Sequence, residues 1–167
     1  MGIPVAKNAL YDFVGHLADS FLLYPVEIHA RSVRKRQVNP RKMYTVDVGL
    51  LRAVAFAGVA NRGAILENLV YLSLRRRSVH PDYYMTANGH EVDFVFENEQ
   101  GGKEFVQVSW SLDDPATRRR EVRALHEALD ECKDASGRVV TWMDEGEAEG
   151  LDVTPAWQWL LAQDPSD

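Results

Sequence analysis

The chain has 167 residues, of which 46% are hydrophobic, and it carries a net charge of −6 and a single cysteine, Cys132. This length fits one ordinary domain, or one small domain with part of another, and the hydrophobic content excludes a largely disordered chain. The negative charge argues against a wholly basic nucleic-acid binder. No apolar run is long enough to cross a bilayer, and no signal segment opens the chain. One cysteine cannot form an internal disulfide. Together these features predict a cytoplasmic location and no membrane partner.

The first part of the chain predicts a helix and a two-stranded hairpin. Apolar residues recur every three or four positions across residues 5–21, which is typical of an amphipathic helix. Aromatic and branched residues at 21–29 and 43–46 predict two strands. A helix followed by a basic hairpin resembles the last part of a winged-helix DNA-binding unit. We interpret residues 1–47 as a partial winged-helix segment, which must bury its apolar face on the rest of the chain or on a partner.

Six basic residues lie between and beside the two predicted strands. A loop of this charge is either a solvated hairpin tip or a loop that contacts phosphates, and composition leaves both interpretations open. The second interpretation makes DNA a partner. The predicted nucleic-acid-binding residues are Arg31, Arg34, Lys35, Arg36, Arg41 and Lys42.

From residue 48 onward the pattern predicts an α/β domain. Asp47 fits the N-cap of a short helix at 48–57, and the most strongly periodic helix spans 64–77. Three strands, a long helix, a strand, and a final short strand and helix follow, so residues 48–167 are interpreted as one domain. The expected strands and long helix are at 83–86, 91–97, 104–112, 114–133, 138–143 and 151–153.

Polar side chains interrupt the apolar pattern at three of these elements. Glu67 lies on the strongest helix, and Asp93 lies among alternating apolar residues of a strand. Glu91, two residues earlier, is expected on the same strand face. The next strand carries Gln107 and Ser109. Clustered carboxylates are the ligands that Mg²⁺ prefers, and bound Mg²⁺ stabilises phosphate charge and helps to generate hydroxide. Alternatively, Glu67 is a rim residue and Asp93 a salt-bridge partner.

This arrangement resembles the PD-(D/E)XK nuclease superfamily. The resemblance implies a restriction-endonuclease-like α/β fold, with a mixed central sheet flanked by helices. Glu67 and Asp93 then match the metal-binding acids, and Glu91 could add a carboxylate. Gln107 stands where the superfamily has a second strand acid, and Ser109 stands where it has a lysine. Glutamine lacks the charge and serine cannot replace an ammonium group, so the predicted catalytic set is degenerate.

Six longer phrases carry a closer resemblance, and they lie at residues 39–50, 66–76, 91–95, 107–109, 117–125 and 155–161. They resemble the C-terminal region of prokaryotic AAA-family ATP-binding proteins, which carry a domain of unknown function, number 4143, with a restriction-endonuclease-like fold. The resemblance implies that the chain is a C-terminal fragment or a truncated relative, with an ATPase module as a partner. The sequence has no G-x-x-x-x-G-K-[ST] motif, so no ATP site is expected in this chain.

Three functions remain open at this point. The first is a binding module, a degenerate nuclease-like domain that docks DNA or a protein and needs no cofactor for its fold. The second is an active Mg²⁺-dependent DNA endonuclease that uses Glu67, Asp93 and Glu91. The third is a partner-dependent subunit with no activity of its own. Gln107 and Ser109 favour the first function over the second, and the basic stretch favours it over the third.

Overall fold

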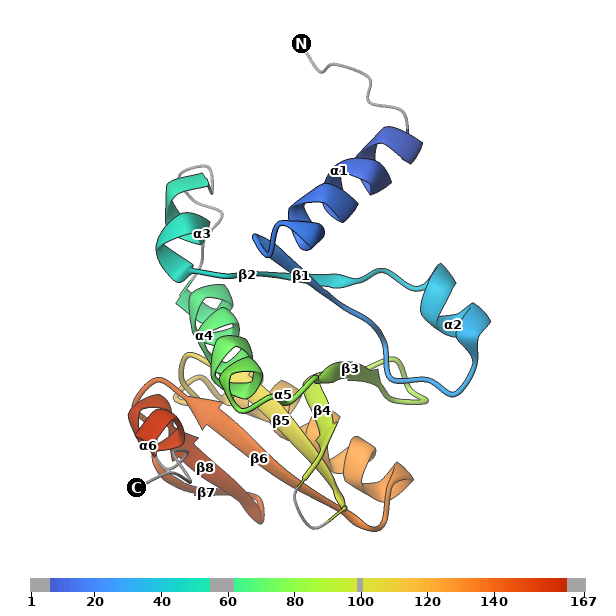
Figure 1. The fold of residues 1–167 in the computed structure, drawn as a ribbon. Coiled ribbons are helices and arrows are strands. Elements are labelled where there is room, and N and C mark those ends of the chain that lie inside the picture. The colour runs from blue at the N-terminus through green and yellow to red at the C-terminus, as the bar shows by residue number, and fades with distance from the viewer. Residues whose placement is uncertain (1–6, 55–61, 99–100, 162–167) are drawn as a thin grey trace.

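A six-stranded mixed sheet forms the centre of the computed structural model, which describes residues 7–54, 62–98 and 101–161 (Figure 1). The strand order is β3-β4-β5-β6-β8-β7. The pairs β5–β6 and β6–β8 are parallel, and the other pairs are antiparallel. The strands are β3 (Asp82–Met85), β4 (Glu91–Glu97), β5 (Lys103–Ser109), β6 (Ala135–Thr141), β7 (Gly146–Ala148) and β8 (Leu151–Pro155).

Helices cover both faces of this sheet. Side chains of α4 and α6 share one buried cluster with Phe94 and Val106 of the sheet. Side chains of α5 share a second buried cluster with Phe105 and Val139. Apolar side chains therefore leave the sheet on both faces, and the predicted mixed α/β architecture is confirmed at this level. The helices are α4 (Arg62–Arg76), α5 (Pro115–Glu131) and α6 (Ala156–Leu161).

The N-terminal part contains the predicted hairpin, in which the two strands pair antiparallel. The segment between the strands differs from the predicted loop, because it forms a short helix. Ser32 caps this helix by accepting a hydrogen bond from the Lys35 N–H at 3.4 Å, which explains why a basic stretch without an apolar period becomes helical. The elements are α1 (Lys7–Asp19), β1 (Leu23–Val26), α2 (Val33–Val38), β2 (Lys42–Thr45) and α3 (Val48–Val54).

The hairpin packs directly on the main sheet and α4, whereas α1 projects away from them (Figure 1). Tyr44 of β2 stacks on Tyr71 of α4 with ring centroids 4.3 Å apart. The domain boundary at residue 47 stays a prediction, and buried contacts cross it. The apolar face predicted for the first helix is not buried on the rest of the described chain, since Leu10 is 56% exposed and Phe13 is 60% exposed.

Several local signals correspond to the structure. The Asp114 carboxylate accepts from the Thr117 N–H at 2.8 Å and caps α5, as predicted. The Asp47 carboxylate likewise accepts from the Leu50 N–H at 3.0 Å at the start of α3, while predicted helical residues 55–57 lie outside the described residues. β7 was not predicted.

No helix in the described parts of the chain is long and apolar enough to span a membrane. The cytoplasmic location stays a prediction.

Candidate functional site

The centre of the candidate site is the ammonium group of Lys42, which lies among three carboxylates. Lys42 Nζ is 2.6 Å from Asp93 Oδ1 and 2.9 Å from Glu67 Oε1. It is also 2.8 Å from Glu91 Oε1. The side chains of Lys42 and Asp93 are only 19% and 9% exposed, so water screens this pair less than it screens a surface ion pair. The structure thus brings together the three acids that the sequence placed on two elements, a helix and a strand.

Lys42 reaches the acids because β2 is fixed against α4. The side-chain amide of Asn68 accepts from the Thr45 N–H at 2.8 Å and donates to the Thr45 carbonyl at 3.1 Å, as a neighbouring strand would. Tyr44, two residues after Lys42, donates its hydroxyl hydrogen to Glu67 Oε1 at 2.7 Å. α4 therefore positions β2, and β2 positions an ammonium and a hydroxyl against Glu67.

Asp93 reaches the site at an irregularity of β4. A two-residue step along β3 matches the step from Val92 to Val95 along β4, so β4 carries one extra residue there. Such a bulge locally re-aims side chains. Val92 consequently packs in the cluster that contains α5, whereas Phe94 packs in the cluster that contains α4; simple alternation had predicted one face for both. The second oxygen of Asp93, Oδ2, accepts from the Val108 N–H of β5 at 2.9 Å.

Gln107 lies beside Asp93, but its amide is used to connect three elements. Its Oε1 accepts from the Asp93 N–H at 3.3 Å, and its Nε2 donates to Glu121 Oε2 at 2.7 Å. Glu121 is a buried acid of α5 that also pairs with Arg120. An acid at position 107 would face the Glu121 carboxylate, whereas a glutamine amide can donate to it. Sequence analysis missed Glu121.

Ser109 is also buried, and its hydroxyl forms a local hydrogen bond just beyond the end of its own strand. Ser109 Oγ donates to the Ser111 carbonyl at 3.0 Å. The position at which the resemblance predicts a lysine therefore holds a locally bonded hydroxyl. The cation at the carboxylates comes from β2 rather than from β5. Sequence analysis had placed Lys42 among the nucleic-acid-binding residues and did not anticipate its contact with the acids.

Burial and the shared ammonium group determine the protonation of the cluster. Burial raises the pKa of Asp93 to about 7, although the nearby charge of Lys42 opposes this shift. Burial alone would lower the pKa of Lys42, but the negative charges around it, chiefly that of Asp93, raise this pKa well above its ordinary value. Burial and the charge of Glu67 likewise raise the pKa of Tyr44. Lys42 and Tyr44 therefore remain protonated at neutral pH, and one cation serves three carboxyl groups.

A pocket of about 400 Å³ opens beside this cluster. His90 also lines the pocket, and its Nδ1 lies 2.8 Å from Glu127 Oε2. This contact lowers the pKa of Glu127. The pocket therefore combines four carboxylates with an imidazole that a fifth acid, Glu127, orients. The candidate residues among its lining are Glu67, Glu91, Asp93 and Gln107, together with Arg120 and Glu121.

The residues present do not fit a divalent cation while Lys42 is in place. Among the described residues, no group of three or more His, Cys, Asp or Glu side chains is arranged to hold a metal ion. The reason is visible in the contacts, because the Lys42 ammonium occupies the point at which the oxygens of Glu67, Glu91 and Asp93 converge. Mg²⁺ requires near-octahedral oxygen ligands at about 2.1 Å, and an ammonium group cannot share that position.

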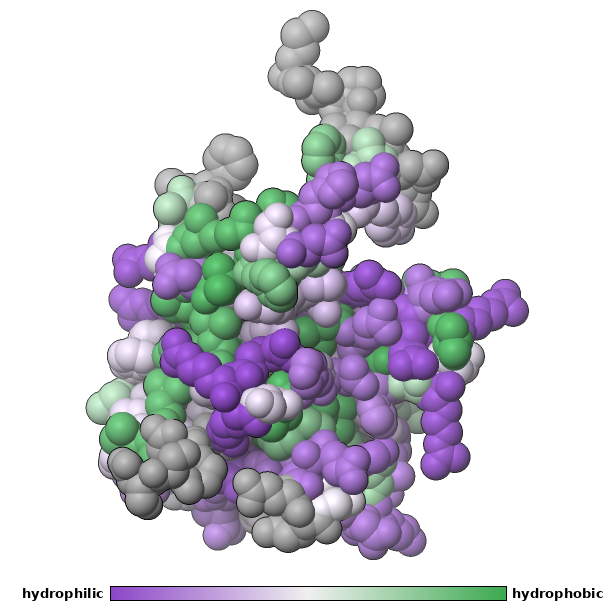
Figure 2. Space-filling view, in the orientation of Figure 1, coloured by the Kyte–Doolittle hydropathy of each residue, from purple (hydrophilic) through white to green (hydrophobic). Residues whose placement is uncertain are grey.

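The other basic residues predicted to bind nucleic acid lie outside the cluster. Arg41 pairs with Glu27 at 2.8 Å, so its charge is matched. Long hydrophilic side chains project where α2 lies in Figure 2. Binding of DNA by this segment stays a prediction, and Lys42 does not belong to its surface. The members that are exposed or half-exposed are Arg31, Arg34, Lys35 and Arg36.

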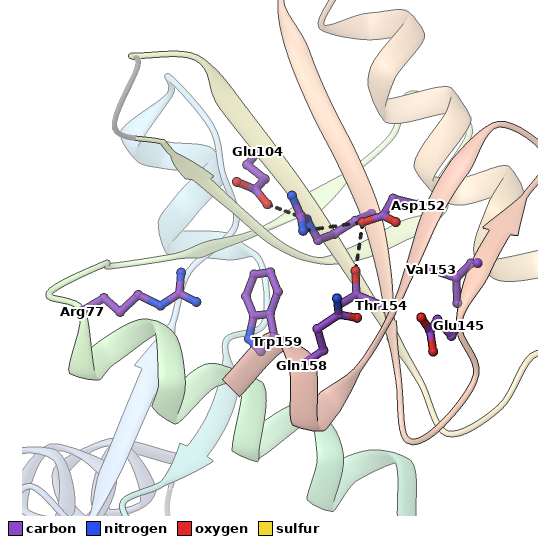
Figure 3. Close-up of a pocket in the computed structure, with 10 residues that line it drawn as sticks. Arg77, Glu104, Glu145, Asp152, Val153, Thr154, Gln158 and Trp159 are labelled. Carbon is purple, nitrogen blue, oxygen red and sulfur yellow. Dashed lines mark hydrogen bonds and ion pairs between the residues drawn. The ribbon is translucent and has the colours of Figure 1, made fainter. Parts of the chain in front are cut away.

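A separate hollow of about 440 Å³ is lined by none of the predicted site residues. Figure 3 shows the indole of Trp159 in this hollow, beside Arg77. The guanidinium carbons of Arg77 and Arg138 lie 4.9 and 5.6 Å from the Trp159 ring centroid, and Arg138 pairs with Glu104 at 2.9 Å. The pocket beside Lys42 is the stronger candidate site, because the predicted acids gather there.

Comparison with known proteins identifies the family. Residues 62–159, more than half of the chain, match the family described as a domain of unknown function, DUF4143, and the chain belongs to this family. The chain is also similar to an uncharacterized protein from Methanocaldococcus jannaschii, with 26% identity over 170 residues. That alignment covers 94% of this chain and 37% of the relative, so the chain spans little more than a third of the relative's length. No solved structure matches.

The matched region includes α4 and the two strands that carry the candidate residues, β4 and β5, but it begins after β2. Glu67, Asp93 and Gln107 therefore lie inside the family match, whereas Lys42 and Tyr44 lie before it. The alternation of Lys42 and Tyr44 about Met43 was the available signal, because residues two apart share one face of a strand. No local pattern indicates that this face meets Glu67, which lies 25 positions further along the chain.

Proposed function

We propose that this domain is a nuclease-derived module that binds nucleic acid without cleaving it, because Lys42 takes the place of a divalent cation. The observation that carries the proposal is the set of three contacts, 2.6 to 2.9 Å long, from the Lys42 ammonium to Glu67, Glu91 and Asp93. A lysine ammonium has three donors and no acceptor. Lys42 donates hydrogen bonds to Glu67 and Asp93 and forms an ion pair with Glu91. It offsets negative charge, but it cannot bind and polarise a phosphate oxygen as a Lewis acid does.

The order of elements supports descent from a restriction-endonuclease-like fold. From α4 onward the chain forms a helix, three antiparallel strands, a helix and a strand parallel to β5. Acids lie on the helix and on the middle strand, where the PD-(D/E)XK resemblance expects them. The same resemblance supports a link to the C-terminal region of AAA-family ATP-binding proteins.

Nucleic-acid binding is supported by the contrast between α2 and the rest of the chain. The protein has a net charge of −6, yet α2 has the sequence VRKRQV, with three basic residues and no acid. The side chains of Arg34 and Lys35 are exposed. Contacts of such residues with phosphates release counterions, so binding through α2 should weaken steeply as salt rises. α2 ends four residues before Lys42, which places the basic surface and the pocket on one connected segment.

Fluorescence anisotropy with labelled duplex and single-stranded DNA tests this proposal. We expect affinity to fall at least tenfold when salt rises from about 50 to about 200 mM. The double variant Arg34→Glu/Lys35→Glu should lose binding to every DNA sequence. The matched control Arg76→Glu/Lys133→Glu changes the same charge at exposed positions elsewhere and should retain it. Equal effects of the two double variants, or binding that ignores salt, would contradict a site on α2.

An active Mg²⁺-dependent DNA endonuclease is the second candidate. The convergence of three carboxylate oxygens on one point of a pocket favours it. It requires that Lys42 leave that point, so the same DNA samples should be incubated with Mg²⁺ beside an Asp93→Ala variant. Cleavage that the variant lacks would establish the enzyme and overturn the non-cleaving module. Absence of both binding and cleavage would instead favour a protein partner, such as an ATPase module.

A further inference from the structure

Two tryptophans form an aromatic stack at the carboxyl ends of two central strands of the main sheet. Ser109 of β5 and Thr141 of β6 are paired in a parallel register, so these strands end level with each other. Each strand is followed directly by a tryptophan, Trp110 and Trp142. Their rings lie 4.9 Å apart, centroid to centroid, with an interplanar angle of 9°. This is a parallel stack of two indoles, and we call it the tryptophan stack.

The tryptophan stack is held rigidly and is open to solvent. The backbone N–H of Trp142 donates to the backbone carbonyl of Trp110 at 3.2 Å. The carboxylate of Asp144 accepts from the Leu112 N–H at 2.6 Å and from the Ser111 hydroxyl at 2.9 Å, which ties the two loops together. Trp142 nevertheless remains 43% exposed. A large aromatic side chain that is both fixed and exposed is a feature of binding surfaces rather than of a core.

A guanidinium group lies against the tryptophan stack. The Arg62 guanidinium carbon lies 5.3 Å from the Trp110 ring centroid. Arg62 opens α4, and the next residue, Gly63, lines the pocket beside Lys42. The loop after Trp110 leads into the first turns of α5, where Arg118 and Arg119 are exposed and Arg118 donates to the Glu147 carbonyl at 3.4 Å. Among the acids of the two loops, Asp144 and Asp114 accept hydrogen bonds, whereas Asp113 and Glu145 are exposed.

We propose that the tryptophan stack binds an unpaired base of a single-stranded nucleic acid, with Arg62 and the first turns of α5 close to its phosphates. This inference rests on the proposed function and adds the class of nucleic acid. A flat, exposed indole beside guanidinium groups matches the combination that single-strand binders use, which is stacking on bases with positive charge along the backbone. Base pairs inside a duplex hide the faces that such a stack would contact.

The test uses the full chain and a labelled oligothymidylate of about ten nucleotides. Trp142→Ala should weaken binding between about 5-fold and about 100-fold, the range that loss of one base–aromatic stack represents. Trp142→Phe should restore most of the affinity, because phenylalanine keeps a stacking face. Trp157→Ala, which removes another exposed tryptophan that lies outside the stack, should leave affinity unchanged. An abasic oligomer of the same length should bind wild type and Trp142→Ala equally.

The outcomes separate this inference from the function on which it rests. Unchanged affinity of Trp142→Ala for the oligothymidylate, or an equal loss on the abasic oligomer, would overturn the stacking site. If α2 charge reversal still abolished binding in that case, the proposed function would stand. If neither oligomer nor duplex bound to the wild-type chain, both proposals would fail together.

Discussion

The neighbouring strands β4 and β5 differ in the charge and in the partners of their polar side chains at the site. At the site, β4 carries the acids Glu91 and Asp93, and both face the ammonium group of Lys42. β5 carries the neutral Gln107 and Ser109, and both are bonded within the protein, to Glu121 and to the strand end. The comparison teaches that, at the site, the acids lie on the strand that faces the Lys42 cation, whereas the neighbouring strand presents neutral side chains that are hydrogen-bonded within the protein.

Removal of the Lys42 cation, on which this comparison depends, should have the largest effect on stability. Lys42→Met leaves three carboxyl groups with no ammonium among them, and uncompensated buried charge is costly. Because the cluster is partly exposed, we expect a loss of about 2–3 kcal/mol in the free energy of unfolding at pH 8. Urea denaturation measures it, with the exposed Lys133→Met as the control. A second change, Asp93→Asn, should restore part of the loss. Additive effects of the two changes would show that the residues do not interact.

The pH dependence of that loss follows from the raised pKa of Asp93. In the folded Lys42→Met variant the pKa of Asp93 lies above its unfolded value, because burial already raises this pKa to about 7 in wild type and the opposing cation is gone. The folded variant therefore holds more protons than the unfolded chain above about pH 4, and its stability falls as pH rises. Wild type loses the Asp93 proton near pH 7 and the variant loses it at higher pH, so the deficit against wild type should grow between about pH 6 and about pH 8. A deficit that is constant over this range would contradict the charge account.

The strand β5 should give smaller effects. Gln107→Ala leaves the Asp93 N–H and one oxygen of Glu121 without their partner, so we expect a loss of about 2 kcal/mol. Ser109→Ala removes one hydrogen bond at the strand end and should lose about 1 kcal/mol. Gln107→Glu sharpens the comparison, because a carboxylate facing Glu121 should destabilise the protein more at pH 8 than at pH 5. An equal loss of stability relative to wild type at both pH values would place residue 107 away from Glu121.

Much of the fold could be predicted because its signals are local. Alternation predicted β4 between its observed limits, and the cap of Asp114 predicted where α5 begins. Glu67 and Asp93 could be assigned to one site because a helix acid and a strand acid resembled a known order. The fold at the level of a mixed sheet flanked by helices is confirmed, whereas the restriction-endonuclease-like assignment remains part of the proposal.

The rest depends on contacts that the local sequence does not encode. Lys42 lies in a basic stretch, and its contact with Asp93 joins positions 51 residues apart. The bulge in β4 depends on its pairing with β3, so simple alternation put Val92 and Phe94 on one face. The apolar face of the first helix was predicted to pack on the rest of the chain or on a partner. No pattern within residues 5–21 specifies the surface that it contacts.

A titration with Mn²⁺, followed by electron paramagnetic resonance of the free ion, tests the central claim most directly. Wild-type protein should bind no Mn²⁺ at concentrations up to about 1 mM. Lys42→Met should gain one site, and Lys42→Met/Asp93→Asn should lose it again. If wild-type protein binds one Mn²⁺ and Asp93→Asn abolishes that binding, Lys42 does not take the place of the cation, and the domain is a metal-binding nuclease candidate after all.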